Sequence, residues 1–174
     1  VEICAREPRL RYVLATGAGR FLRCGNPFEE ICKTTCGTNI AWRQGASAIN
    51  RLASLEERVP GTDFRVFPSP SRLLRAGENR LREISRLGYR VPYLLDLARR
   101  AVLRDQEWRR LEEEDLEREE LSRLLLQVQG VGKASSRYLL MVWGKGEEIS
   151  VDSSVYLYCR QERFRGRAPT EKQI

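Results

Sequence analysis

The chain has 174 residues, of which 41% are hydrophobic and 32% charged, with a formal net charge of +7 and an isoelectric point near 9.5. This length suits one domain or two small lobes around a cleft, and the composition excludes a disordered chain. No apolar run is long enough to cross a membrane and no signal peptide is recognisable, so we expect an intracellular protein with a polyanionic partner.

The cysteines are odd in number and irregularly spaced, which argues against a disulfide framework and favours a reducing compartment. Cys32 and Cys36 are one helical turn apart, but the chain has no histidine and no second cysteine pair to complete a four-ligand metal site. We therefore expect ordinary buried helix residues and no metal site. The five are Cys4, Cys24, Cys32, Cys36 and Cys159.

The first predicted helix spans residues 27–37. Asn26 is a favourable N-cap, Pro27 suits a first turn, and Gly37 stands at the end of the segment. Periodic apolar side chains predict a second helix over residues 42–57. These two segments indicate that this part of the chain is helical.

Prolines and glycine predict a loop over residues 59–70. Ser71 is expected to cap a short helix that follows. The later predicted helices span residues 72–76, 79–86, 92–103, 116–128, 133–143 and 153–162. A further helix start is predicted at 168–171. No segment is a strong strand candidate, so the chain is predicted to be all-α with short connections.

The charges are unevenly distributed along the chain. Residues 112–120 are strongly acidic, and we interpret them as a solvated helix face or loop that points away from a polyanion. The basic excess lies over residues 72–90 and 160–167.

The segment Gly130-Val131-Gly132 separates an apolar helix from a new one. Two glycines allow a positive φ and a close approach of the backbone to a ligand. The N–H groups at the start of the new helix suit a phosphate, and the side chains of Lys133, Ser135 and Ser136 could add contacts. The alternative is a tight helix–helix turn in which glycine only serves as a C-cap.

Asp152 follows a glycine-rich turn, residues 144–146, and opens the last predicted helix. One interpretation is an N-cap for that helix. A carboxylate fixed in this way also suits glycosidic cleavage, because it can stabilise the positive charge that builds on the sugar or activate a water molecule.

Three blocks in order, Asn26-Pro27-Phe28-Glu29, Gly130-Val131-Gly132 and Val151-Asp152-Ser153, resemble the helix-hairpin-helix/Gly-Pro-Asp superfamily of DNA glycosylases, the group of endonuclease III and the 3-methyladenine glycosylases. The resemblance implies a six-helix barrel over residues 26–146 and a second lobe from 1–25 and 147–174. It implies a monomer that binds double-stranded DNA and flips a damaged base into a cleft edged by Asp152.

The resemblance also assigns roles around the flipped base. Asn39 falls where relatives place a polar residue that fills the vacated gap, although it could be only a loop residue. Gly88-Tyr89-Arg90 resembles the loop that leads into the next barrel helix. An alkylated purine is cationic and stacks on aromatic faces, whereas uracil and oxidised purines stay alternatives. The candidate pocket residues, each of which could instead be core, are Trp42, Tyr93, Trp143 and Tyr156.

The sequence departs from the family in ways that bear on mechanism. Bifunctional members carry a nucleophilic lysine two residues after the second hairpin glycine, where this chain has Ala134. Lys133 is one residue earlier and is turned by about 100° on a helix. We therefore expect a monofunctional enzyme that uses water and acts on an alkylated purine. The alternatives are a lyase that uses Lys133, a non-catalytic DNA-binding module, and a helical protein that binds no nucleic acid.

Two further expectations concern loops and cofactors. The usual proline of the family's Gly/Pro loop is absent from residues 144–151. The family's four-cysteine iron–sulfur loop would lie beyond Ile174, so the sequence does not indicate whether the protein binds such a cluster. The hairpin could hold a monovalent cation, and no other cofactor is expected within the chain.

Overall fold

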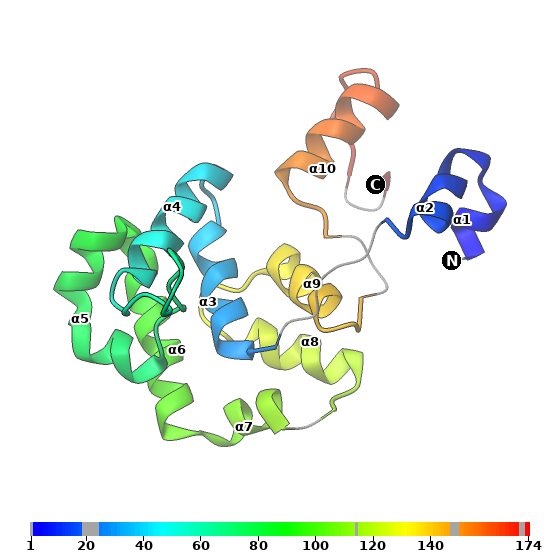
Figure 1. Ribbon diagram of the computed structural model, residues 1–174. Helices are drawn as coiled ribbons and strands as arrows, with labels where there is room; N and C mark the ends of the chain where they lie inside the picture. The colour runs from blue at the N-terminus through cyan, green and yellow to red at the C-terminus, as the bar shows by residue number, and fades with distance from the viewer. Residues whose placement is uncertain (1, 19–24, 114, 147–149, 171–172) are drawn as a thin grey trace.

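The computed structural model describes residues 2–18, 25–113, 115–146, 150–170 and 173–174, and these form helices and connecting turns (Figure 1). The described residues contain no β-strand, and their one isolated bridge pairs Arg58 with Arg65. The all-α prediction is therefore confirmed. None of the described helices is both long and apolar enough to span a bilayer.

The elements follow one another with short connections. In chain order they are α1 (Glu2–Arg6), the 3-10 turn η1 (Pro8–Leu10), α2 (Arg11–Thr16), α3 (Pro27–Gly37), α4 (Trp42–Ala53), α5 (Pro70–Ser85), the 3-10 turn η2 (Gly88–Arg90), α6 (Val91–Leu103), α7 (Gln106–Glu113), α8 (Arg118–Leu126), α9 (Lys133–Val142), α10 (Ser153–Tyr158) and the π-helical turn η3 (Cys159–Arg163).

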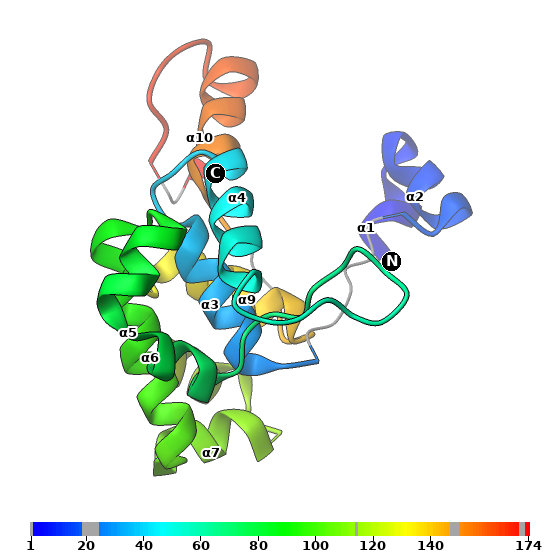
Figure 2. The same cartoon turned by 60° about the vertical axis from the view of Figure 1, so that its left-hand side comes forward.

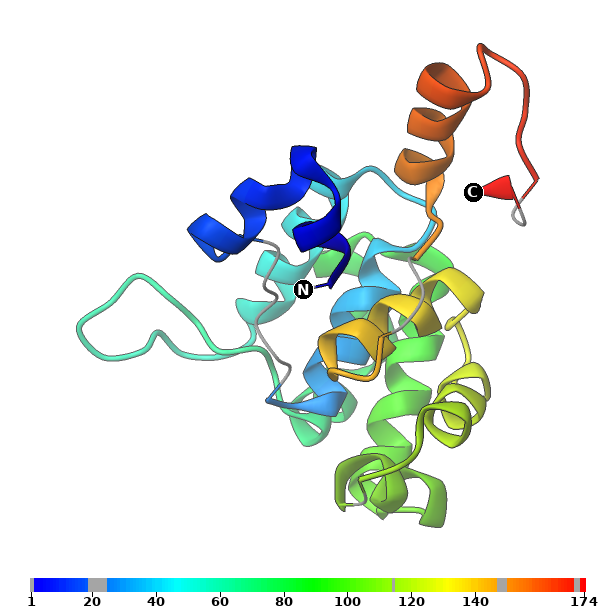
Figure 3. The same cartoon turned by 90° about the vertical axis from the view of Figure 1, so that its right-hand side faces the viewer.

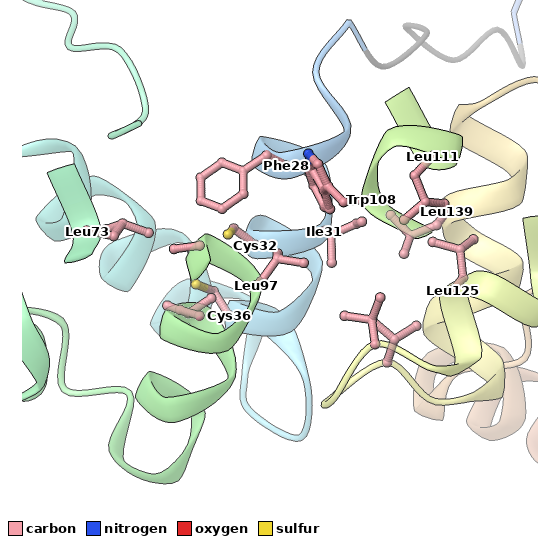
Figure 4. Close-up of a cluster of buried hydrophobic side chains, with 14 of the residues drawn as sticks. Phe28, Ile31, Cys32, Cys36, Leu73, Leu97, Trp108, Leu111, Leu125 and Leu139 are labelled. Carbon is pink, nitrogen blue, oxygen red and sulfur yellow. The ribbon is translucent and has the colours of Figure 1, made fainter. Parts of the chain in front are cut away.

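Helix α3 lies at the centre of the helical body formed by α3 to α9 (Figures 1 and 4). Its side chains Phe28, Ile31 and Cys32 are buried among residues of α6 to α9. Trp108 of α7 is fully buried and meets the Phe28 ring edge-on, with centroids 6.2 Å apart. Each such buried side chain contributes roughly 1.5–3 kcal/mol. This core fixes the relative positions of the helices that carry the candidate site.

Helix boundaries agree best with prediction where a side chain caps the backbone. Asn26 Oδ1 accepts a hydrogen bond from the N–H of Glu29, and α3 has the predicted limits. Helix α4 ends at Ala53, earlier than predicted, because the Ser54 hydroxyl donates to the carbonyl of Arg51 and the chain turns there.

Helix α5 begins at a different residue from the one that the sequence predicts. Ser69, rather than Ser71, is the N-cap, because its Oγ accepts from the N–H of Arg72 and Pro70 takes the first helical position. Gly77 has a φ of 73°, which breaks the helix at the place where two short helices were predicted. Before Ser69, the predicted loop projects from the body and is closed by a 2.9 Å ion pair between Arg58 and Asp63 (Figure 3).

The C-terminal region differs from the prediction in its helix limits. Helix α10 ends at Tyr158 and continues as the π-helical turn η3, so the predicted span 153–162 is not a single α-helix. Residues 168–170 are not helical, and Glu171 lies outside the described residues. The N–H of Thr170 nevertheless donates to Gln173 Oε1 at 2.9 Å, a bond typical of a helix start.

The terminal elements stand outside the helical body (Figures 1 and 2). Among described residues, α1 and α2 make their main contacts with each other and with η1, and α10 makes its main contacts with η3. The division into a barrel over 26–146 and a lobe from 1–25 and 147–174 stays a prediction. The elements that position the candidate site are α3, α4, α9 and the start of α10.

Candidate active site

A groove of about 1790 Å³ lies between α3, the α3–α4 turn, the hairpin before α9 and the segment that opens α10. It brings together residues that are more than 100 positions apart in sequence, including Asn39 and Asp152. Gly130, Lys133 and Tyr93 also line it. The blocks singled out in the sequence therefore face one common space.

The hairpin is anchored to the body through Gly130 and Val131. Gly130 has a φ of 91°, and a Cβ at this position would lie 2.7 Å from Tyr93 Cδ2 and 3.4 Å from Thr35 Cγ2. Val131 is buried in the core. The first hairpin glycine is thus required both by the backbone conformation and by close packing against α3 and α6.

Gly132 is different, because its own chain does not require glycine. Its φ of −94° and ψ of −178° are accessible to any residue, and a Cβ would have no heavy atom within 4 Å. The first hydrogen bond of α9 is donated by Ser136 to the carbonyl of Gly132. Within the described part of the chain, the N–H groups of the residues just before Ser136 have no acceptor, so they can bind an anion. The space beside Gly132 allows an anion to approach those groups.

The hairpin side chains are not equivalent. Lys133 is exposed and Ser135 is half-buried, and both line the groove. Ser136, predicted as a phosphate contact, is only 2% exposed and its Oγ has no hydrogen-bond partner in the described part of the chain. Its side chain faces the core and does not line the groove, so it does not offer that contact.

Asp152 is both a helix cap and a groove residue, so the two interpretations of the sequence are compatible. Its Oδ1 accepts hydrogen bonds from the N–H groups of Ser154 and Val155, each at 2.9 Å. Its side chain is exposed and lines the groove, and Oδ2 makes no hydrogen bond to any residue that the structure describes. One oxygen is therefore fixed by α10 while the other is available to a ligand.

Ser150 connects the Asp152 segment to the hairpin helix. Its Oγ donates a 2.8 Å hydrogen bond to the carbonyl oxygen of Ala134, in the first turn of α9. Sequence analysis did not single out Ser150, because a serine in a loop carries no distinctive signal. Ala134 and Lys133 both line the groove.

Asn39 lies exposed in the α3–α4 turn, with a φ of 50°, and lines the groove. Arg90, which is only 6% exposed, stabilises this turn. Its Nε donates to the carbonyl oxygen of Thr38 at 3.0 Å and to Thr38 Oγ1 at 3.3 Å, and its guanidinium lies 4.4 Å from the ring centroid of Tyr89. Sequence analysis missed this role because arginine is rarely buried.

The four predicted pocket aromatics separate into two groups. Trp42 and Tyr93 both line the groove. Trp42 has 83% of its surface exposed. Tyr93 is half-buried and its ring meets that of Tyr89 edge-on, with centroids 6.0 Å apart. Trp143 packs against the core, and Tyr156 is half-buried; neither is a lining residue. Only the first pair is placed to contact a ligand in the groove.

The cysteines and the acidic run lie apart from this chemistry. Burial raises the pKa of the Cys36 thiol to about 12, against a smaller lowering effect of Arg90, and burial raises the pKa of Cys32 as well. No set of three or more His, Cys, Asp or Glu side chains among the described residues could hold a metal ion. The described part of the acidic run 112–120 does not line the groove, and Glu120 pairs with Arg110 at 2.6 Å.

No family model matches the chain. It is 27% identical to a probable N-glycosylase/DNA lyase of Methanothermobacter thermautotrophicus, over 84% of this chain and 53% of that protein. Its fold is similar to an 8-oxoguanine glycosylase/lyase of Clostridium acetobutylicum, solved with DNA, with a TM-score of 0.78 and 21% identity over 98% of this chain and 59% of that one.

A 3-methyladenine DNA glycosylase of Archaeoglobus fulgidus is similar at a TM-score of 0.75 and 20% identity, over 98% of this chain and 59% of that one. The chain thus spans a little over half the length of these three relatives. The chain has the helical DNA glycosylase fold, and its resemblance to the helix-hairpin-helix/Gly-Pro-Asp superfamily is confirmed.

Proposed function

We propose that the chain is the catalytic part of a DNA glycosylase of base excision repair, which hydrolyses the N-glycosidic bond of a damaged base flipped out of the duplex. The observation that carries the proposal is the shared groove. It joins an exposed helix N-terminus, suited to a DNA phosphate, to the half-fixed carboxylate of Asp152.

The hairpin would bind the DNA backbone without reading sequence. The open space at Gly132 admits a phosphate oxygen, the N–H groups of the first turn of α9 donate to it, and Lys133 adds a positive charge. Asn39 would enter the gap left by the flipped base. The net charge of +7 supports association with a duplex.

Asp152 would act when the bond to the base lengthens and positive charge develops on the sugar. The hydrogen bonds to Oδ1 hold the carboxylate in one orientation, and Oδ2 is left to face the sugar or to accept a proton from water. Such preorganised groups need no rearrangement in the transition state. The products are an abasic site and the free base.

Water is the proposed nucleophile. The methyl group of Ala134 stands where bifunctional relatives have a lysine, and alanine cannot form a Schiff base with the sugar. An alkylated purine is the proposed base, because the absence of that lysine resembles the branch of the family that acts on this class. Lyase activity is a second candidate, favoured by the exposed amine of Lys133 in the same groove.

The test uses the full-length protein and duplexes that each hold one lesion: an alkylated adenine, uracil, 8-oxoguanine or thymine glycol. Strand cleavage that appears only after alkali is expected, on the alkylated duplex, because alkali cuts the abasic site. Asp152→Asn should abolish base release and leave DNA binding intact. Equal activity in this variant would overturn the role of Asp152.

Cleavage without alkali, together with borohydride trapping of a covalent adduct that Lys133→Ala removes, would establish the lyase instead. Salt-sensitive duplex binding with no base release on any lesion would favour a non-catalytic DNA-binding module.

A further inference from the structure

One wall of the groove is formed by two helix faces, most of whose side chains have no part in the proposed mechanism. Glu30, Lys33 and Thr34 of α3 lie on one side, and Ala134 and Tyr138 of α9 on the other. Spacings of three and four residues place the members of each set on one helix face. The carbonyl oxygen of Ala134 accepts the hydrogen bond from Ser150, so this wall reaches the segment that carries Asp152.

Glu30 is an unusual residue in a groove suited to DNA. Its half-buried carboxylate accepts a 3.3 Å hydrogen bond from the Tyr138 hydroxyl, and no cation pairs with it within the described part of the chain. The neighbouring Glu29, in contrast, forms an ion pair with Lys33. A partly dehydrated negative charge without a cationic partner is unfavourable by itself and repels phosphate.

We propose that Glu30, oriented by Tyr138, is a specificity-determining residue that selects a flipped base carrying a positive charge. The inference rests on the proposed function and deepens it, because it names the residue that would distinguish a cationic alkylated purine from a neutral lesion. The cation supplies the missing partner of the carboxylate, and the face of the Tyr138 ring adds a favourable cation–π contact. A neutral base gains neither interaction.

The substitution Glu30→Gln separates this role from a structural one. The glutamine side-chain oxygen still accepts the hydrogen bond from Tyr138, so the tie between α3 and α9 is kept while the charge is removed. Glu29→Gln is the matched control. It removes the same charge at the neighbouring position, and the side chain of Glu29 does not line the groove.

The measurement is equilibrium binding to two duplexes, so that it does not depend on turnover. One duplex contains 7-methylguanine on a 2′-fluoro sugar, which keeps the cation and resists cleavage, and the other contains guanine on the same sugar. The wild-type and Glu29→Gln proteins are expected to prefer the cationic duplex by about tenfold, the effect of one charge interaction in a partly shielded site. Glu30→Gln should bind the two duplexes equally.

No preference in the wild-type protein, or a preference that survives Glu30→Gln, would overturn the inference. Failure of the proposed function would look different: the preference would be present and Glu30-dependent, yet no lesion would be released. A parallel urea titration shows that both variants are folded.

Discussion

The two sides of the groove are held in place by different means. On the side of the helical body, Gly130 packs against Tyr93 and Thr35, and Val131 is buried in the main core. On the other side, no residue of α10 is buried, and Asp152 is positioned by its own cap hydrogen bonds and by the Ser150 bond to α9. The hairpin is thus part of the core, whereas the carboxylate depends on a few hydrogen bonds at or near the surface.

The largest expected effect concerns the side of the helical body. Gly130→Ala should lower the free energy of unfolding by about 2–4 kcal/mol, because the new methyl group meets Tyr93 and the backbone has a positive φ. Urea unfolding measures the change. Gly132→Ala is the control: it should cost less than about 1 kcal/mol and should instead weaken DNA binding, because its methyl group fills the phosphate space. Equal destabilisation by both would contradict this description of the hairpin.

Thiol labelling compares the two sides directly. In variants that retain one cysteine, Cys159 of η3 should react at least about 100-fold faster than Cys32 or Cys36 of α3, since local opening costs less than global unfolding. Equal rates would mean that both sides open together.

The raised pKa of Cys36 predicts a pH dependence of stability. Between the ordinary thiol pKa of 9.0 and about 12, the unfolded chain loses a proton that the native protein keeps, so the free energy of unfolding should fall as the pH rises through this range.

Trp42, at the start of α4, is the most exposed aromatic side chain that lines the groove on the side of the helical body. Because bases stack on aromatic side chains, Trp42→Ala should weaken duplex binding by about 1–3 kcal/mol, and Trp42→Phe should retain most of the affinity. Trp108 is buried and Trp143 packs against the core, so quenching of tryptophan fluorescence by DNA should come mainly from Trp42. Undiminished quenching in Trp42→Ala would show that DNA does not contact this part of the groove.

The smallest effect is expected on the Asp152 side. Ser150→Ala removes one hydrogen bond, a loss of about 0.5–1.5 kcal/mol, and should lower kcat for base release several-fold with little change in global unfolding. Ser150→Thr, which keeps the hydroxyl, should restore activity. An unchanged kcat in Ser150→Ala would show that the carboxylate is positioned without this bond.

The sequence was most informative where local chemistry determines structure. Asn26 and Pro27 predicted the start of α3, and the glycines predicted the hairpin, because caps and positive φ values are properties of a few adjacent residues. The burial of Ser136 and Arg90 was not predictable in this way, since it depends on which helices pack together. For the same reason the Glu30–Tyr138 contact, across 108 positions, has no local signature.

The buried guanidinium of Arg90 has a consequence for the proposed binding of DNA. By binding the carbonyl of Thr38, it orders the turn that carries Asn39 before any duplex arrives. The turn therefore loses its conformational entropy when the chain folds, and this loss does not reduce the affinity for DNA. In the proposed function, this loop then needs no rearrangement at a damaged site, and the conformational barrier to binding would lie in the DNA, as the base leaves the stack.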